Sequence, residues 1–134
     1  SKEIRDLLLE ELEVQRVLQM ALTADLSFVG IGALEPSNSF SQFGYSSKED
    51  LELLTRLGAA GEIHGEYFDA EGQSLKLEQH DRLIATRLSD LRKMKQVVGV
   101  AGGERKLEAL RGTLRGNLIS TLITDERTAQ ALLQ

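Results

Sequence analysis

Two glycines at the end of an apolar segment, Gly102 and Gly103, are closely followed by the basic residues Arg105 and Lys106. The apolar segment VVGV before them is typical of a buried strand, and the segment from residue 104 onward has helical spacing. A helix N-terminus carries unpaired N–H groups and a partial positive charge, so a phosphate could bind there with the Lys106 ammonium as a further donor. Alternatively, the glycines only allow a tight turn.

A second glycine-rich segment, GIGALEPSNS, begins at Gly30 and continues an apolar run. Backbone N–H groups at Gly32 and Ala33 could approach a ligand closely, because glycine removes the steric barrier of a side chain. Neither glycine segment has the spacing of a Walker A loop or of a dinucleotide fingerprint. In an open parallel sheet, ligands bind beyond the carboxyl ends of the strands. We therefore expect both segments to lie at one edge of a sheet.

The chain shows no set of residues that declares an enzyme or a metal site. His64 and His80 are far apart in sequence, and there is no cysteine, so no zinc site is expected. No Ser/His/Asp or Cys/His nucleophile set is apparent, and no cofactor is expected. Glu62 begins a segment of alternating polarity, where its carboxylate could accept hydrogen bonds from sugar hydroxyls or could be an exposed charge at a strand end.

Helical and strand-like patterns alternate along the sequence, which predicts an α/β fold with a mostly parallel, Rossmann-like sheet flanked by helices. Ser47 and Asp50 form a capping-box pattern, while Ser89 and Thr124 are expected to cap the later helices. Gly58 is expected to end the helix that Ser47 begins. The helices are expected over residues 2–22 with a break near Glu10 and Glu11, 46–59, 90–94, 104–116 and 125–134, and the strands over 26–34, 61–72, 82–89, 96–103 and 117–124.

A long polar loop over residues 35–47 contains the only proline. Its aromatic residues Phe40, Phe43 and Tyr45 could cover a pocket or could simply anchor the loop.

Composition sets the broad class of the protein. The chain has 134 residues, of which 41% are hydrophobic, so a single domain with its own core is expected. The net charge of −5 and the absence of a Lys/Arg block disfavour direct binding of DNA. No apolar run is long enough to span a membrane, and no signal peptide opens the chain, so we expect a cytoplasmic protein without a membrane partner.

Four blocks in a fixed order carry a resemblance to a known family. They are GIGxLxPxxS, GAAGEIHGEYFDAEG, VxGVAGGxxKxEAL and LITDExTAxALL. From about residue 5 to the end, the chain resembles the C-terminal sugar-binding (effector) domain of SorC/DeoR-type bacterial transcriptional regulators. The resemblance implies a fold similar to that of ribose-5-phosphate isomerase and glucosamine-6-phosphate deaminase.

The resemblance also implies effector sensing rather than turnover. Members of this family bind phosphorylated sugars or related metabolites, and the effector changes how a homo-oligomer, a dimer or a tetramer, binds its operator. Their DNA contacts come from an N-terminal helix-turn-helix, which is absent here, as is the family's first ligand loop. Residues 1–134 are therefore expected to form a single, partial effector domain.

The family motifs assign roles to individual residues. Gly30 and Gly32 would line the pocket, Glu62 would hold sugar hydroxyls and Lys106 would meet the phosphate. Asp81 and Arg82 match a family D-R step more loosely. The effector-binding residues predicted in this way are Gly30, Gly32, Ala33, Glu62, Gly102, Gly103 and Lys106.

Two alternatives remain open on the sequence alone. A sugar-phosphate isomerase or deaminase of the same fold would need a placed general acid and base, which the sequence does not reveal. A purely structural oligomerisation module would instead use the apolar stripe of residues 4–21 to contact a sister subunit.

Overall fold

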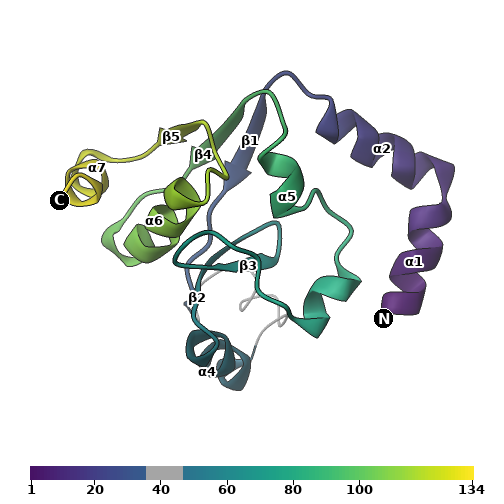
Figure 1. Ribbon diagram of the computed structural model, residues 1–134, viewed down its shortest axis with the longest axis horizontal. Coiled ribbons are helices and arrows are strands. Elements are labelled where there is room, and N and C mark those ends of the chain that lie inside the picture. The colour runs from purple at the N-terminus through teal and green to yellow at the C-terminus, as the bar shows by residue number, and fades with distance from the viewer. Residues whose placement is uncertain (36–46) are drawn as a thin grey trace.

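The computed structural model describes residues 1–35 and 47–134 (Figure 1). The aromatic residues Phe40, Phe43 and Tyr45 of the predicted loop lie outside the described residues. In chain order the elements are α1 (Lys2–Glu10), α2 (Leu12–Leu22), β1 (Ser27–Gly30), α4 (Lys48–Arg56), β2 (Ala59–Ile63), β3 (Glu66–Asp69), the 3₁₀ helix η1 (Glu78–Arg82), α5 (Leu88–Leu91), β4 (Val97–Val100), the 3₁₀ helix η2 (Glu104–Lys106), α6 (Leu107–Arg115), β5 (Thr121–Ile123) and α7 (Glu126–Leu132).

Strands β1, β4 and β5 form a parallel sheet in which β4 lies in the middle. The register pairs Gly30 of β1 with Val100 of β4, and Val100 in turn with Ile123 of β5. The carboxyl ends of these strands therefore meet at the same edge of the sheet. This arrangement, with helices beside the sheet (Figure 1), confirms the predicted α/β class.

The two faces of this sheet differ in what covers them. Val29, Ile31 and Val97 on the inner face are buried in a core that also contains Leu91 of α5 and Leu110 of α6. On the outer face, Phe28, Val100 and Ile123 are 63%, 47% and 52% exposed. The cluster around Val29 and Leu110 thus lies on one side of the sheet, while Val98 of the central strand is buried on the other face.

The segment over residues 61–72, predicted as one strand, instead contributes to the antiparallel hairpin of β2 and β3. The chain reverses at His64 and Gly65, which have φ angles of 56° and 81°. Such a turn needs positive φ, which glycine adopts without cost and histidine adopts uncommonly. Gly32, just after β1, forms an antiparallel bridge with Glu62 of β2, so the hairpin is joined to the parallel sheet.

The predicted strand over residues 82–89 is wrong. The chain passes from η1 into α5, because the Leu88 N–H donates to the Glu66 carboxylate at 2.9 Å instead of to a neighbouring strand. Arg87 precedes α5 as its N-cap, so Ser89 lies inside the helix rather than capping it.

The boundaries of α1, α2 and α4 are as the sequence predicts, whereas the start of α7 is not. The N-terminal helical segment breaks at Glu11, between α1 and α2. Ser47 and Asp50 form the expected capping box of α4, and Gly58 follows that helix with a φ of 82°. The N-cap of α7 is Asp125, so the predicted cap at Thr124 is wrong by one residue.

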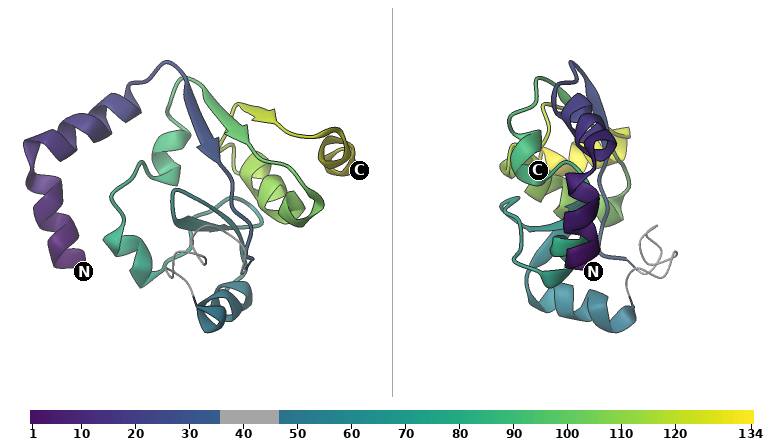
Figure 2. Two further views of the ribbon diagram at one scale, coloured as in Figure 1. Left: turned by 180° about the vertical axis from the view of Figure 1, so that it is seen from behind. Right: turned by 90° about the vertical axis from the view of Figure 1, so that its right-hand side faces the viewer.

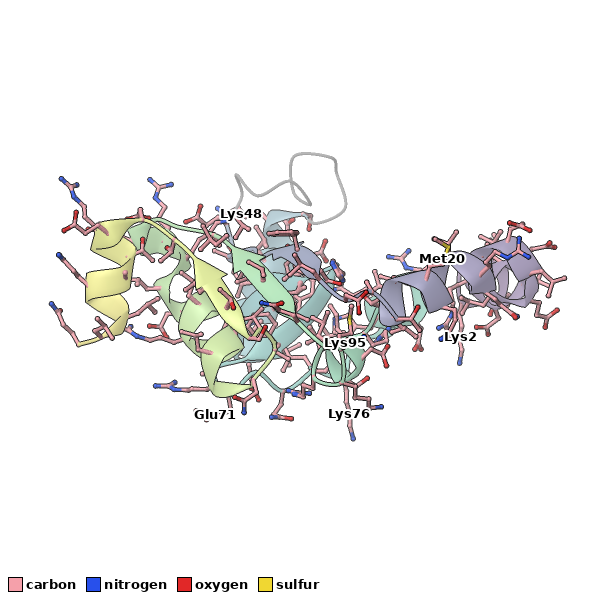
Figure 3. The ribbon with its side chains drawn as sticks, turned by 90° about the horizontal axis from the view of Figure 1, so that it is seen from above. Lys2, Met20, Lys48, Glu71, Lys76 and Lys95 are labelled. Atoms are coloured by element: carbon pink, nitrogen blue, oxygen red, sulfur yellow. The ribbon has the colours of Figure 1, made fainter. Side chains whose placement is uncertain are left out.

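Helices α1 and α2 form an arm that extends away from the sheet (Figures 2 and 3). Within the described residues, neither helix has a buried side chain, and Leu7 and Leu12 are 64% and 77% exposed. Among residues 1–35 and 47–134, no helix is long and apolar enough to cross a membrane.

A buried polar network holds the hairpin against α5. Glu66, only 4% exposed, accepts hydrogen bonds from the Ser74 hydroxyl at 2.6 Å and from the Leu88 N–H, and it pairs with Arg87 at 3.0 Å. Burial alone would raise the Glu66 pKa, but these donors outweigh it and lower the pKa. His80 Nε2 accepts the Tyr67 N–H at 2.9 Å. Burial lowers the pKa of His80, which favours the neutral ring that can accept this bond.

Lowering the pH from about 7.5 to about 5.5 should reduce the free energy of unfolding. The folded pKa of His80 lies below its ordinary value of 6.5, so its contribution is complete above that value and is lost as the pH falls through the folded pKa. Urea denaturation at both pH values measures the difference. His80→Gln should shrink it, because glutamine can accept the Tyr67 N–H without titrating.

Replacement of the exposed His64 by glutamine is the matched control, and it should retain the wild-type difference. A His80→Gln variant that retains the full pH dependence would contradict this assignment to His80.

Candidate functional site

Predicted site residues gather at the carboxyl edge of the parallel sheet. Gly30 ends β1 and the Gly102–Gly103 turn follows β4, and a further residue, Asp125, follows β5. The parallel register aligns these strand ends. The structure thus brings together segments that lie far apart in the sequence, at the position where open parallel sheets bind ligands.

Lys106 connects the loop after β4 to the loop after β1. Its ammonium donates to the carbonyl oxygen of Ile31 at 2.8 Å, and its backbone N–H donates to the carbonyl oxygen of Gly103 at 3.0 Å. The side chain is half-buried. An ammonium carries three N–H groups, so this contact leaves donors for an anion beside Gly30–Gly32, the GIG segment.

Glu62 contacts the same GIG segment at the next residue, Gly32. The backbones of Gly32 and Glu62 exchange two hydrogen bonds, at 2.9 and 3.0 Å. A β-carbon at Gly32 would overlap Oε1 of Glu62, so only glycine leaves room for this carboxylate. The other oxygen, Oε2, accepts the Gly65 N–H at 2.8 Å, which fixes the side chain. Ala33, the next residue in the segment, is buried.

The Gly102–Gly103 turn is held by side chains at the start of α7. Gly103 has a φ of 101°, a conformation that favours glycine, and its N–H donates to both Asp125 Oδ2 at 2.9 Å and Thr128 Oγ1 at 2.8 Å. That N–H is therefore engaged within the protein. The helix that follows starts as the 3₁₀ turn η2 and becomes α-helical only at Leu107. The groups predicted to bind an anion here are backbone N–H groups and the Lys106 ammonium, and only the ammonium carries a full charge.

Asp125 is the site residue that the sequence analysis missed. Its Oδ1 accepts the Thr128 N–H at 2.9 Å as the cap of α7, and its Oδ2 accepts the Thr128 hydroxyl at 2.6 Å. The hydrogen bonds from the Thr128 hydroxyl and N–H, with that from Gly103, lower the Asp125 pKa to about 2. The Asp-x-x-Thr spacing before an apolar helical stretch was the available signal for this cap.

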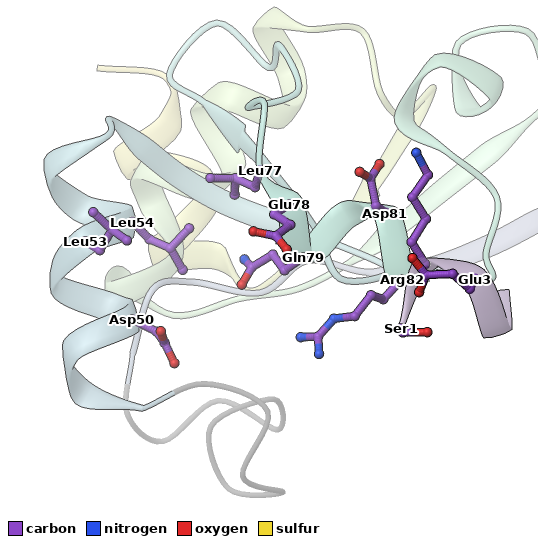
Figure 4. A pocket seen from close by; sticks show the side chains of 11 residues that line it. Ser1, Glu3, Asp50, Leu53, Leu54, Leu77, Glu78, Gln79, Asp81 and Arg82 are labelled. Atoms are coloured by element: carbon purple, nitrogen blue, oxygen red, sulfur yellow. The ribbon is translucent and has the colours of Figure 1, made fainter. Parts of the chain in front are cut away.

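The remaining candidates lie elsewhere. His64 is exposed at the hairpin turn, where it contacts the Thr86 hydroxyl at 2.9 Å. Asp81 and Arg82 belong to η1 and line a pocket of about 660 Å³ between η1, α4 and the start of α1 (Figure 4). This pocket contains none of the predicted effector-binding residues. In the part of the chain that the structure describes, no group of three His, Asp or Glu side chains could hold a metal ion.

Sequence comparisons relate the chain to regulators of transcription. All of residues 1–134 match a family described as "Putative sugar-binding domain". The chain is 37% identical to the transcriptional regulator LsrR of Klebsiella pneumoniae over 136 residues, covering 99% of this chain and 42% of that protein. It is 36% identical to the erythritol catabolism regulatory protein EryD of Brucella abortus over 131 residues, covering 98% of this chain and 41% of that protein. The chain thus spans about two fifths of the length of these relatives.

The fold is also similar to that of a solved regulator. A DeoR family transcriptional regulator from Listeria monocytogenes superimposes with a TM-score of 0.93 and 28% sequence identity, covering 98% of this chain and 53% of that one. The α/β arrangement described above is therefore shared with a regulator of this class.

The two glycines of the GIG segment should respond differently to substitution by alanine. Gly32→Ala should lower the free energy of unfolding by about 1–3 kcal/mol, because the new methyl group displaces the Glu62 side chain. Gly30→Ala is the matched control, since no atom lies within 4 Å of the position that its β-carbon would take. Urea denaturation of both variants measures the difference. Equal losses of unfolding free energy in the two variants would show that contact with Glu62 is not the reason why position 32 needs glycine.

Proposed function

Because the chain belongs to the family of sugar-binding domains of SorC- and DeoR-type transcriptional regulators, we propose that it binds a phosphorylated sugar at the carboxyl edge of its parallel sheet. The observation that carries this proposal is the placement of Lys106 and Glu62. The ammonium lies against Ile31 and the carboxylate lies against Gly32, so groups of opposite charge contact adjacent residues of one short backbone segment.

These two groups suit the two ends of a sugar phosphate. An ammonium donates charge-assisted hydrogen bonds to phosphate oxygens, and a carboxylate accepts hydrogen bonds from hydroxyl groups. A carboxylate next to the phosphate would repel it, so the ligand has a preferred direction, with its phosphate at Lys106 and its hydroxyl groups at Glu62. Gly30 and Ala33, adjacent to this segment, would form part of the pocket wall.

Binding would act on transcription through a shift between two states of the whole regulator. A ligand changes an equilibrium only when it binds one state more tightly than the other. In this proposal the effector favours one arrangement of a homo-oligomer and so alters its affinity for the operator, which a separate DNA-binding domain contacts. The names of the relatives as transcriptional regulators support this role rather than turnover of the sugar.

Thermal unfolding of the full-length protein with a panel of sugars, each with and without phosphate, tests the ligand class. A ligand at about a hundred times its Kd should stabilise the protein by about 2.7 kcal/mol, which raises Tm by several degrees. Lys106→Ala should weaken binding of the phosphorylated sugar and strongly reduce the shift that it causes. Arg105→Ala removes a neighbouring exposed cation, whose side chain is 80% exposed, and should retain the shift. Loss in both variants, or no shift with any sugar phosphate, would contradict the proposal.

Glu62→Gln tests the sugar end of the site. The amide retains the size of the side chain but lacks the charge that strengthens its bonds to hydroxyl groups, so affinity for the sugar phosphate should fall by about tenfold. Affinity for inorganic phosphate, measured by isothermal titration, should stay unchanged in the same variant. An equal loss for both ligands would place Glu62 outside the sugar-recognition end.

A further inference from the structure

We propose that Asp125 is the positioning residue of this site, because its carboxylate fixes the Gly102–Gly103 turn and thereby sets the position of Lys106. This inference rests on the proposed function of Lys106, and it assigns a role to a residue outside the glycine segments. The contacts form a continuous path from the N-terminus of α7 to the GIG segment.

The two oxygens of Asp125 have different partners. Oδ1 accepts the backbone N–H of Thr128 and caps α7, whereas Oδ2 accepts the backbone N–H of Gly103. The Thr128 hydroxyl donates to Oδ2 and accepts the same Gly103 N–H, so it completes a closed triangle of hydrogen bonds. Thr128 itself is fully buried. The carboxylate is thus fixed at the N-terminus of α7 and holds the turn at a defined place.

The turn is shaped to accept this carboxylate. A β-carbon at Gly102 would overlap Asp125 Oδ2, and the φ of 101° at Gly103 is one that side-chain-bearing residues rarely adopt. The absence of a side chain at Gly102 thus leaves room for the Asp125 carboxylate, and the positive φ of Gly103 accompanies the hydrogen bond of its N–H to that carboxylate. A turn that only reversed the chain would not need a carboxylate packed against its first glycine.

The position of Lys106 follows from that of the turn. Its backbone N–H donates to the carbonyl oxygen of Gly103, and its ammonium reaches Ile31. When Asp125 no longer accepts the Gly103 N–H, that N–H keeps only the Thr128 hydroxyl as acceptor. The turn then gains freedom, and the ammonium is held less firmly beside the GIG segment. Asp125 therefore acts on the ligand through Lys106, without a contact of its own to the phosphate.

Asp125→Asn in the full-length protein separates the two roles of the side chain. Asparagine is a good N-cap, so Tm should stay near that of the wild type, but its amide cannot accept from both Thr128 and Gly103. Hydrogen exchange without ligand should become faster at the Gly103 and Lys106 amides. Affinity for the sugar phosphate that stabilises the wild type should fall by about tenfold, the loss expected of one hydrogen bond to a charged group. Asp125→Ser, which keeps a cap but is shorter, should behave in the same way.

A double-mutant cycle distinguishes positioning from general support of the fold. Since Asp125 acts through Lys106, Asp125→Asn should not weaken binding further in a Lys106→Ala background. Glu126→Gln removes the same charge one residue later in α7, and it should leave exchange and affinity unchanged.

Unchanged exchange at Gly103 and Lys106 in Asp125→Asn, or additive losses in the cycle, would overturn the assignment of Asp125. If no sugar phosphate binds the wild type, the proposed function fails by that result. The exchange measurement then decides independently whether Asp125 holds the turn: faster exchange supports this assignment, and unchanged exchange overturns it.

Discussion

The two hydrogen bonds between the backbones of Gly32 and Glu62 join the parallel sheet to the β2–β3 hairpin. This junction ties β2 to the segment after β1, while the Glu66 network holds the same hairpin against α5. Once joined, it places Ile63 and Phe68 over the inner face of the sheet, where they enter the same core as Ile31. The junction also places the Glu62 carboxylate at the edge of the sheet. The junction therefore links the packing of the core to the geometry of the site, and glycine at position 32 leaves room beside it for the Glu62 side chain.

Charged side chains hold much of the irregular backbone of this domain. Glu66 accepts the Leu88 N–H, Asp125 accepts the N–H groups of Gly103 and Thr128, and Arg92 donates to the carbonyl oxygens of Gly72 and Gly116 at 2.6 and 2.8 Å. Buried backbone groups need partners, and short strands and helices leave many of them outside regular ladders. Carboxylates and guanidinium groups satisfy several such groups at once, and they fix loops relative to elements distant in sequence.

The parts of the fold that depend on local patterns could be predicted from the sequence. The break at Glu11 and the capping box of Ser47 follow from nearby residues, and the alternation of helical and strand-like segments along the chain predicts the parallel sheet. The hairpin turn was missed because alternating polarity is the same on both sides of His64 and does not reveal its positive φ. The strand expected at residues 82–89 failed because Glu66, 22 residues before Leu88, takes the Leu88 N–H. Contacts of this kind, including that of Asp125 with Gly103, are set by tertiary structure.

The pairing of β1 with β4 also has a consequence for the order of folding. The β2–β3 hairpin joins neighbours in sequence, whereas Lys106 meets Ile31 across 75 residues of chain. Long-range pairing must first overcome the entropy of loop closure, so local hairpins form earlier than parallel sheets. The Glu62 side of the edge is therefore expected to take shape while the Lys106 side is still unformed. The proposed ligand, which would contact both residues, would therefore bind only after β1 and β4 have paired.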